Sequence, residues 1–265
     1  MAANQSGKTL ASAIEVACHA SGRYPSWWPG RRFDEATHGW VAGVSNEVVR
    51  DTIQKLLLGN TGEHGTGTIP KNALIDVITA RGIADLVDII RVAHASGGIS
   101  TITLKSYSAG REKFQGSTLD YVALDEEAPI DIYSEALTRT NATRGLVWST
   151  FTPLLGVSEV VRRFMYEQSE DRALVTMTID DVDHSDDAQR EQIAASYSEH
   201  EREARTRVSP PWARGASFRF RKIALSANTA TSPLTGRASV AWTSDGPITS
   251  PLASLLMTAT MTSFI

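Results

Sequence analysis

The chain has 265 residues, of which 42% are hydrophobic and 21% charged, an ordinary composition for a soluble globular protein. Its net charge of −4 excludes a general electrostatic attraction to nucleic acid, so binding to DNA would need locally clustered basic residues. The single cysteine, Cys18, excludes an internal disulfide and favours a reducing compartment. Because no apolar run reaches the ~18 residues of a membrane span and no signal peptide is visible, we expect a cytosolic protein.

The chain begins with a candidate phosphate-binding loop, residues 2–9 (AANQSGKT). This loop matches G-x-x-x-x-G-K-[ST] with Ala in place of the first Gly, a pattern whose backbone N–H groups hold nucleotide phosphates. Lys8 is expected to contact the β- and γ-phosphates, and the Thr9 hydroxyl to bind Mg²⁺. Apolar residues at helical spacing follow, so a helix is predicted to direct its N-terminus at the bound anion. The residues predicted to bind nucleotide are Asn4, Gln5, Ser6, Gly7, Lys8 and Thr9.

The next segment, residues 23–33 (RYPSWWPGRRF), is rich in turn-forming and aromatic residues. Two interpretations are possible. The favoured one is a loop whose tryptophans cap the hydrophobic core. The other is a surface that faces nucleotide or DNA.

Apolar runs of strand type then recur along the chain. The first, residues 39–44, precedes a helical pattern that runs through Val48 and Leu57 and ends near Gly59. Further strand-like runs cover residues 99–104, 119–124, 145–151 and 173–179, and patterns that could form helices lie between several of them. This alternation predicts an α/β fold with a buried, mostly parallel sheet and flanking helices.

A pair of carboxylates follows the run at residues 119–124. Asp125 is expected at the carboxyl end of a strand, beside the phosphate loop of the neighbouring strand. Asp125 could then hold Mg²⁺ while Glu126 polarises the attacking water. A solvated strand end would also explain acidic residues here, but it is the poorer explanation because Lys8 and Thr9 are present in the same alternating chain.

Hydroxyl side chains end the next predicted strand, at Ser149, Thr150 and Thr152. Next to a hydrolysis site, such residues can sense the γ-phosphate and relay its loss. Ordinary strand-end capping explains them equally well, and both interpretations stay open.

Several of these motifs together resemble the large subunit of tailed-phage terminases, the DNA-packaging motors. The resemblance covers residues 2 to about 207 and includes AANQSGKT, the run beginning YPSWWPGRRF, GGISTITLKSYSAGREKFQG, VALDEE and WSTFTPLLG. It implies a P-loop NTPase domain of the additional-strand, RecA-like type at residues 1–185, without its first strand, and a linker helix at 186–207. By position, it implies Lys8 and Thr9 as phosphate and metal residues, Asp125 as the Walker B metal residue and Glu126 as the catalytic carboxylate. Ser149, Thr150 and Thr152 correspond to the coupling motif.

The resemblance also implies a function and partners. The family hydrolyses Mg-ATP to translocate double-stranded DNA into the procapsid, in the cytoplasm of the host and away from any membrane. The implied partners are the portal protein, the terminase small subunit and further copies of the chain in a ring. Two alternative interpretations are that the chain is an inactive truncated remnant of a terminase, or that it is another P-loop translocase such as a helicase.

The chain departs from the family at its phosphate loop. Many terminases carry an arginine there, whereas Asn4 or Gln5 stands in that region of this chain. The charge that stabilises the transition state would therefore come from elsewhere, and Arg139, Arg144 or a neighbouring subunit are candidates.

Residues 208–265 differ in composition from the rest of the chain. Asp245 is the only carboxylate in them, although the whole chain has 30. A shifted reading frame across residues 241–246 can encode Leu-Asp-Phe-Gly-Trp, which resembles the first strand of a terminase nuclease domain. We therefore hypothesise that a frameshift near Val208 replaced that domain with a disordered, non-native tail, and we assign no nuclease residue. A shifted frame across residues 217–224 can likewise encode Glu-Phe-Pro-Val-Pro-Glu-Asp-Arg, and a stop codon in the alternative frame between these two sites would refute the hypothesis.

Overall fold

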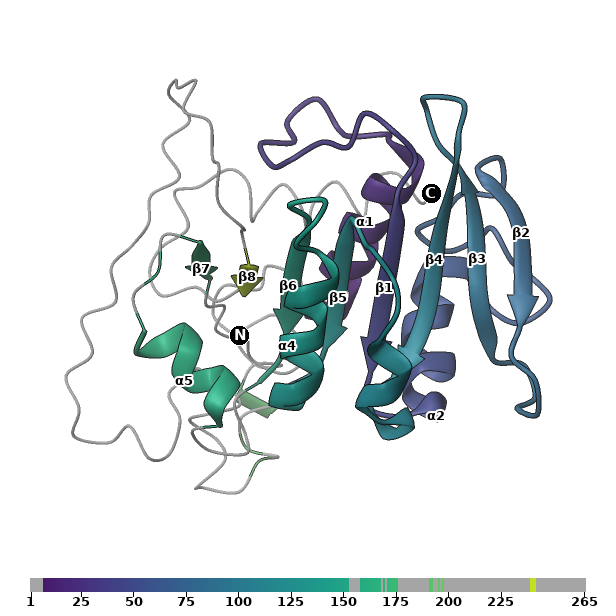
Figure 1. The fold of residues 1–265 in the computed structure, drawn as a ribbon. Helices are drawn as coiled ribbons and strands as arrows, with labels where there is room; N and C mark the ends of the chain where they lie inside the picture. The colour runs from purple at the N-terminus through teal and green to yellow at the C-terminus, as the bar shows by residue number, and fades with distance from the viewer. Residues whose placement is uncertain are drawn as a thin grey trace.

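The computed structural model describes residues 7–152, 158–167, 169, 171–175, 191, 192, 195 and 197, and the backbone of 239–241. These residues form an eight-stranded sheet in the order β2-β3-β4-β1-β5-β6-β8-β7, with helices on both faces (Figure 1). The strands are β1 (His38–Gly43), β2 (Leu74–Thr79), β3 (Val87–Ala93), β4 (Ile99–Ser106), β5 (Tyr121–Asp125), β6 (Leu146–Thr150), β7 (Arg172–Leu174) and β8 (Ser239–Ala241).

The sheet is mostly parallel, as the sequence predicts. The parallel pairs are β1–β4, β1–β5, β5–β6, β6–β8 and β7–β8. The pairs β2–β3 and β3–β4 are antiparallel, and this hairpin is absent from the strands expected from the sequence. The reason lies in β2, where register shifts interrupt the ladder on β3. Only Leu74 and Val77 are partly buried there, and this three-residue spacing does not show the alternation typical of a strand.

Helices form a layer on each face of the sheet. Helix α1 and the segment from α2 to α3 share one hydrophobic core with the sheet, whereas α4 and α5 share the other. Strand β5 serves both cores, because Tyr121 and Ala123 pack in the first and Val122 and Leu124 in the second. The helical elements are α1 (Lys8–Ser21), α2 (Asn46–Val48), the π-helix η1 (Val49–Gln54), α3 (Lys55–Leu58), the 3₁₀-helices η2 (Tyr107–Ala109) and η3 (Arg111–Phe114), α4 (Ile130–Arg139) and α5 (Glu159–Met165).

Helix α1 begins where the sequence predicts. Gly7 precedes it with a φ of +80°, in the left-handed region that glycine adopts without strain. At the other end Gly22, with a φ of +66°, donates its backbone N–H to the carbonyl of Cys18. The helix packs on the sheet through small apolar residues such as Ala13, Ala17 and Ala20. The phosphate loop is thereby joined to a helix that is fixed along its length.

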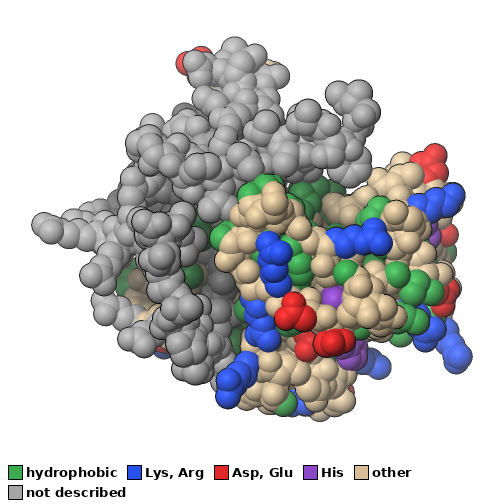
Figure 2. Space-filling model, turned by 90° about the horizontal axis from the view of Figure 1, so that it is seen from above, with side chains coloured by type: hydrophobic (Ala, Val, Ile, Leu, Met, Phe, Trp, Pro, Cys, Tyr) green, Lys and Arg blue, Asp and Glu red, His purple; other side chains and the backbone are tan. Residues whose placement is uncertain are grey.

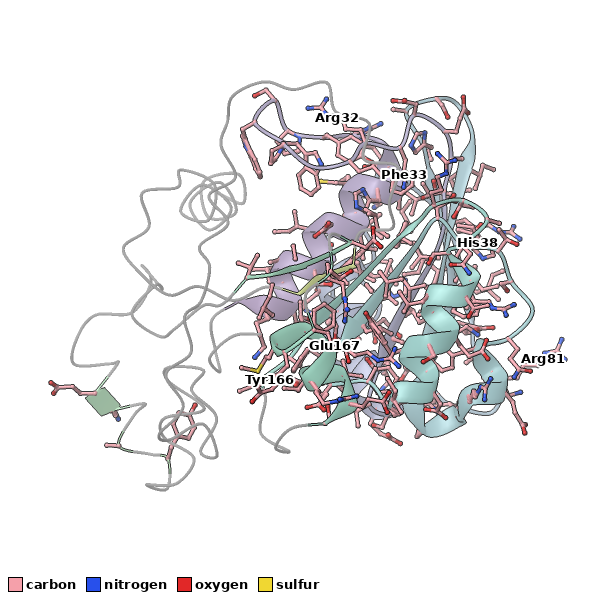
Figure 3. All side chains as sticks on the ribbon, turned by 60° about the vertical axis from the view of Figure 1, so that its left-hand side comes forward. Arg32, Phe33, His38, Arg81, Tyr166 and Glu167 are labelled. Atoms are coloured by element: carbon pink, nitrogen blue, oxygen red, sulfur yellow. The ribbon has the colours of Figure 1, made fainter. Side chains whose placement is uncertain are left out.

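The aromatic segment 23–33 lies at the carboxyl end of α1, opposite the phosphate loop. The ring of Trp28 lies 5.9 Å from that of the buried His19, and the ring of Phe33 lies 5.0 Å from it. Figure 3 shows Arg32 and Phe33 at this end of α1, away from Tyr166 at the end of α5. Figure 2 views the molecule from above this edge and shows Lys and Arg side chains spread over it with Asp and Glu between them. Trp28 and Phe33 therefore cap the core, in agreement with the favoured interpretation.

The predicted linker helix and tail fall almost entirely outside the described residues. Within 208–265, the structure describes only the backbone of β8, which pairs with β6 and β7. The frameshift hypothesis stays a prediction. Among the described residues, no helix combines the length and the apolar character needed to cross a membrane.

Candidate nucleotide-binding site

Three segments distant in the sequence meet at the carboxyl ends of β5 and β6. Lys8, the first residue of α1, donates a hydrogen bond from Nζ to the Thr152 hydroxyl at 2.6 Å. The hydroxyl of Thr9 donates to Oδ1 of Asp125 at 3.0 Å. Asp125 ends β5, and Thr152 lies two residues beyond the end of β6. The structure therefore brings the phosphate-loop residues next to the strand-end carboxylate and hydroxyls.

Asp125 is held in place by two hydroxyl groups. Besides Thr9, Thr150 donates to the same Oδ1 at 2.8 Å, from the position directly beside Asp125 in the parallel ladder. The side chain of Asp125 is buried, with 5% of the residue exposed. Burial raises the pKa of this carboxyl group, whereas the bonds from Thr150 and Thr9 and the charge of Lys8 lower it. The two threonines thus favour the ionised carboxylate that a cation needs.

Glu126 has an unusual backbone conformation. Its φ is +62°, one of three positive values among the described non-glycine residues, and such left-handed residues often lie at functional sites. Its backbone N–H donates to the Thr150 carbonyl at 2.8 Å. Burial raises the pKa of the Glu126 carboxyl group, while the Lys8 charge lowers it and the Asp125 charge raises it. The carboxyl group therefore lies in a partly dry environment beside Lys8.

Lys8 completes the charge arrangement. Burial lowers the pKa of its ammonium group, and the carboxylates of Glu126 and Asp125 act in the opposite direction. One positive charge thus faces two acidic groups at the start of a 14-residue helix, where the helix dipole also favours an anion. This arrangement suits a phosphate group that carries its own cation.

Thr9 and Asp125 have the chemistry of a magnesium site. Mg²⁺ prefers hard oxygen ligands and usually takes only one or two from the protein, the rest coming from water and substrate phosphates. A hydroxyl and a carboxylate 3.0 Å apart fit that preference. No group of three or more His, Cys, Asp or Glu side chains among the described residues could hold a metal ion instead.

The other predicted site residues divide into three groups. Asn4, Gln5 and Ser6 lie outside the described residues. Ser149 is buried next to Thr150 on β6, but successive side chains of a strand point to opposite faces. Its hydroxyl has no hydrogen-bond partner among the described residues. Thr150 and Thr152 therefore bond to Asp125 and Lys8, whereas strand alternation places Ser149 on the opposite face of β6.

The two candidate arginines lie at the other edge of the sheet. The carbonyl of Arg139 accepts a hydrogen bond from the backbone N–H of Leu119, just before β5 begins. Arg144 lies two residues before β6 begins, and the five residues of that strand span roughly 16 Å. Neither arginine of this chain is near Asp125, at the ends of these strands.

One buried residue near the site was not predicted from the sequence. Tyr107, which follows β4, donates a hydrogen bond from its hydroxyl to the Asp125 carbonyl at 2.9 Å. The only sequence signal is its place in the segment SYSAG (residues 106–110), shortly after the strand predicted at residues 99–104.

A Gly-Lys-Thr helix start beside an aspartate at the end of a parallel strand defines the class of P-loop nucleotide-binding proteins. The family described as "Terminase large subunit, T4likevirus-type, N-terminal" matches residues 1–225. The chain belongs to this family.

Two relatives are terminase large subunits of phages. The chain is 43% identical over 240 residues to the terminase large subunit of Salmonella phage P22, covering 83% of this chain and 48% of that protein. It is 34% identical over 188 residues to the terminase large subunit of Enterobacteria phage LP7, covering 68% of this chain and 39% of that protein. The chain thus spans about half the length of these relatives, or less.

Solved structures of two phage terminases also match. The large terminase ATPase domain of Thermus phage P74-26 is 17% identical with a TM-score of 0.47, over 77% of this chain and 84% of that chain. The large terminase of another thermophilic bacteriophage, solved in complex with ADP, is 13% identical with a TM-score of 0.49, over 76% of this chain and 45% of that chain.

Proposed function

We propose that this chain binds Mg-ATP beside α1 and hydrolyses it, as the ATPase portion of a phage DNA-packaging terminase. The observation that carries the proposal is the hydrogen bond between Thr9 and Asp125, since it joins the phosphate-loop helix to the acidic end of β5. Membership of the terminase large subunit family supports the same activity.

The phosphates would lie at the start of α1, with Lys8 as their point charge. Thr9 and Asp125 would hold the cation that neutralises charge on the phosphate oxygens. Thr150 contributes indirectly, because its bond to Asp125 keeps that carboxylate ionised and oriented. The backbone groups of residues 4–6 are proposed to complete the phosphate contacts.

Glu126 is proposed as the group that orients the attacking water and accepts its proton. A general base works best when its pKa is close to the working pH. Burial raises the pKa of the Glu126 carboxyl group, which moves it toward the working pH. Glu126 follows the metal residue Asp125 directly, so the two carboxyl groups can act on neighbouring oxygens of the same reaction.

Thr150 and Thr152 are proposed to couple hydrolysis to movement. Lys8 donates to the Thr152 hydroxyl at 2.6 Å, and because an ammonium group has three N–H donors, Lys8 could contact a phosphate and Thr152 together. Binding or loss of the γ-phosphate would thereby change the position of Lys8 and its hydrogen bond to the end of β6. Movement of that strand end would be passed to the segment that follows it.

The substrate for translocation would be double-stranded DNA, moved into a procapsid in the host cytoplasm together with a portal protein and a terminase small subunit. Among the described residues, the charges that act on Glu126 are Lys8, Asp125 and Glu127, with no arginine. We therefore assign the arginine that stabilises the transition state to a neighbouring copy in a homo-oligomeric ring.

An ATPase assay on the purified 265-residue chain, with and without DNA, tests the proposal. Lys8→Ala should lower the rate by on the order of 100-fold, because it removes a charge aimed at the transferred phosphoryl group. Lys71→Ala, at an exposed position outside the site, is the matched control and should keep the parental rate. Equal background rates in the parental chain and Lys8→Ala would mean an inactive remnant. Strand separation of a partial duplex would instead indicate a helicase.

A further inference from the structure

Tyr107 contacts the backbone on both sides of Glu126. Its hydroxyl oxygen lies 2.9 Å from the carbonyl oxygen of Asp125 and 3.3 Å from that of Glu126. A third carbonyl, that of Ala42 at the end of β1, lies 3.4 Å away. A phenol has one proton to donate, so the shortest of these contacts, to Asp125, is the main hydrogen bond. The first two carbonyls belong to the peptide groups before and after the Glu126 Cα.

These contacts occur where the backbone is under strain. Glu126 has a φ of +62°, a value that residues other than glycine rarely adopt. Such a conformation persists only where the surrounding structure determines it strongly. On one side, the Glu126 N–H donates to the Thr150 carbonyl at 2.8 Å. On the other side, Tyr107 is the side chain that bonds to the carbonyls.

Tyr107 is itself firmly fixed. It is the first residue of η2, directly after β4, and 8% of it is exposed. It belongs to the hydrophobic core that also contains Leu124 of β5 and Ile132 of α4. The next residue, Ser108, donates its backbone N–H to the Val44 carbonyl at 3.2 Å, which ties the start of η2 to the chain just after β1. The hydroxyl is therefore presented from a rigid base.

We propose that Tyr107 is a positioning residue for Glu126: its hydroxyl holds the strained turn of residues 125–126 and so orients the Glu126 carboxylate toward the attacking water. This inference rests on the proposed function, because it assigns Glu126 the role of the base. Tyr107 does not touch the reacting groups. It acts through the two peptide carbonyls.

Tyr107→Phe tests the proposal, because it keeps the ring in the core and removes only the hydroxyl. The kcat for ATP hydrolysis should fall about tenfold or more, while the KM for ATP stays within about twofold, since the nucleotide contacts of Lys8 and Thr9 are unchanged. Tyr121→Phe is the matched control. It removes the hydroxyl of a second buried tyrosine, at the opposite end of β5 from Asp125, and should keep the parental kcat.

Hydrogen–deuterium exchange provides a readout that does not depend on hydrolysis. In Tyr107→Phe, the Glu126 amide should exchange about tenfold faster than in the parental chain, while the amides of residues 122–124 keep their protection. Unchanged exchange at Glu126 overturns the proposal, as does a parental kcat in Tyr107→Phe or an equal loss of kcat in Tyr121→Phe. If the parental chain hydrolyses no ATP, the proposed function fails, and faster exchange at Glu126 still supports the backbone-holding role of Tyr107.

Discussion

Lys8 Nζ lies 2.6 Å from the Thr152 hydroxyl, although 144 positions separate the two residues in the sequence. This bond links the helix that carries Lys8, the lysine proposed to bind phosphate, to the end of β6. A second link lies deeper in the same interface, where Trp148 on β6 donates from Nε1 to the Ser12 hydroxyl on α1 at 2.8 Å. Helix α1 and strand β6 are thus joined at two levels, and only the outer bond involves a residue that would contact nucleotide. Thr152 is therefore the point at which phosphate could alter the α1–β6 contact.

Thr152→Val should separate hydrolysis from its stimulation by DNA. Valine keeps the shape of threonine but cannot accept the hydrogen bond of Lys8. Lys8 remains available to the phosphates, so nucleotide affinity should change by less than about threefold. The increase in ATPase rate on adding DNA should be lost, because the end of β6 no longer forms a hydrogen bond with Lys8. Fluorescent ADP titration and ATPase rates with and without DNA measure the two effects. A DNA-stimulated rate equal to that of the parental chain would contradict the coupling role.

Thr150→Val should weaken magnesium binding. The Thr150 hydroxyl donates to Asp125 at 2.8 Å, and a hydrogen bond to a charged group contributes about 1.5–3 kcal/mol. Without it, Asp125 loses one of the two hydroxyls that favour its ionised form. We expect the Mg²⁺ concentration for half-maximal ATPase activity to rise about tenfold. Ser149→Ala, on the opposite face of the same strand, should leave it unchanged. Equal effects of the two substitutions would place Thr150 outside the metal site.

The predictable part of the site is the part with local signatures. Lys8 and Thr9 follow a loop pattern at a helix start, whereas Asp125, Thr150 and Thr152 follow the ends of apolar strands. Since the carboxyl ends of parallel strands meet at one edge of a sheet, the pattern also predicts that these groups converge. Ser149 shows the limit of this reasoning, because strand alternation places neighbouring hydroxyls on opposite faces.

The features that were not predicted depend on contacts distant in the sequence. The Tyr107 hydroxyl bonds to carbonyls 18 and 19 positions away, and no local pattern marks a tyrosine for that role. The hairpin of β2 and β3 was not recognised, because bulges in β2 remove the alternation that identifies strands. Arg139 and Arg144 have no local signature either, and the structure places them near the starts of β5 and β6, away from Asp125.

Cys18 should make the protein less stable at alkaline pH. Burial, and secondarily the charge of Glu15, raise the pKa of this thiol from 9.0 to about 12. The unfolded thiol therefore ionises first, so the contribution of Cys18 to the free energy of unfolding is complete below pH 9.0 and is lost as the pH rises toward 12. Between pH 8 and 10.5 the loss should be on the order of 2 kcal/mol.

Urea unfolding at the two pH values measures this loss. In Cys18→Ala, the free energy of unfolding should fall less between the two pH values than in the parental chain. The difference should equal the loss assigned to the thiol. The remaining decrease would include Tyr24, whose pKa burial also raises to about 12. Identical decreases in the two proteins would show that the Cys18 thiol does not have a raised pKa in the folded state.

Gly39→Ala should strongly destabilise the sheet at the end of β5 opposite Asp125. A Cβ at Gly39 would lie 2.1 Å from Cζ of Tyr121 on the neighbouring strand β5. The Tyr121 ring is fully buried and stacks on Trp148 with 5.6 Å between ring centroids, so it cannot move aside without disturbing β6. Overpacking of this kind costs about 1–3 kcal/mol, and we expect the upper part of that range. Chemical denaturation gives the change in the free energy of unfolding.

Gly30→Ala provides the control for the loss of glycine itself. Gly30 lies in the exposed loop that follows α1, and a Cβ there would have as its nearest atom Nε1 of the Trp28 side chain, at 3.1 Å. Surface substitutions without a buried clash change stability by less than about 0.5 kcal/mol. If Gly39→Ala lowered the free energy of unfolding no more than Gly30→Ala, β1 would not pack tightly against Tyr121. The position of β5, and with it of Asp125, would then need revision.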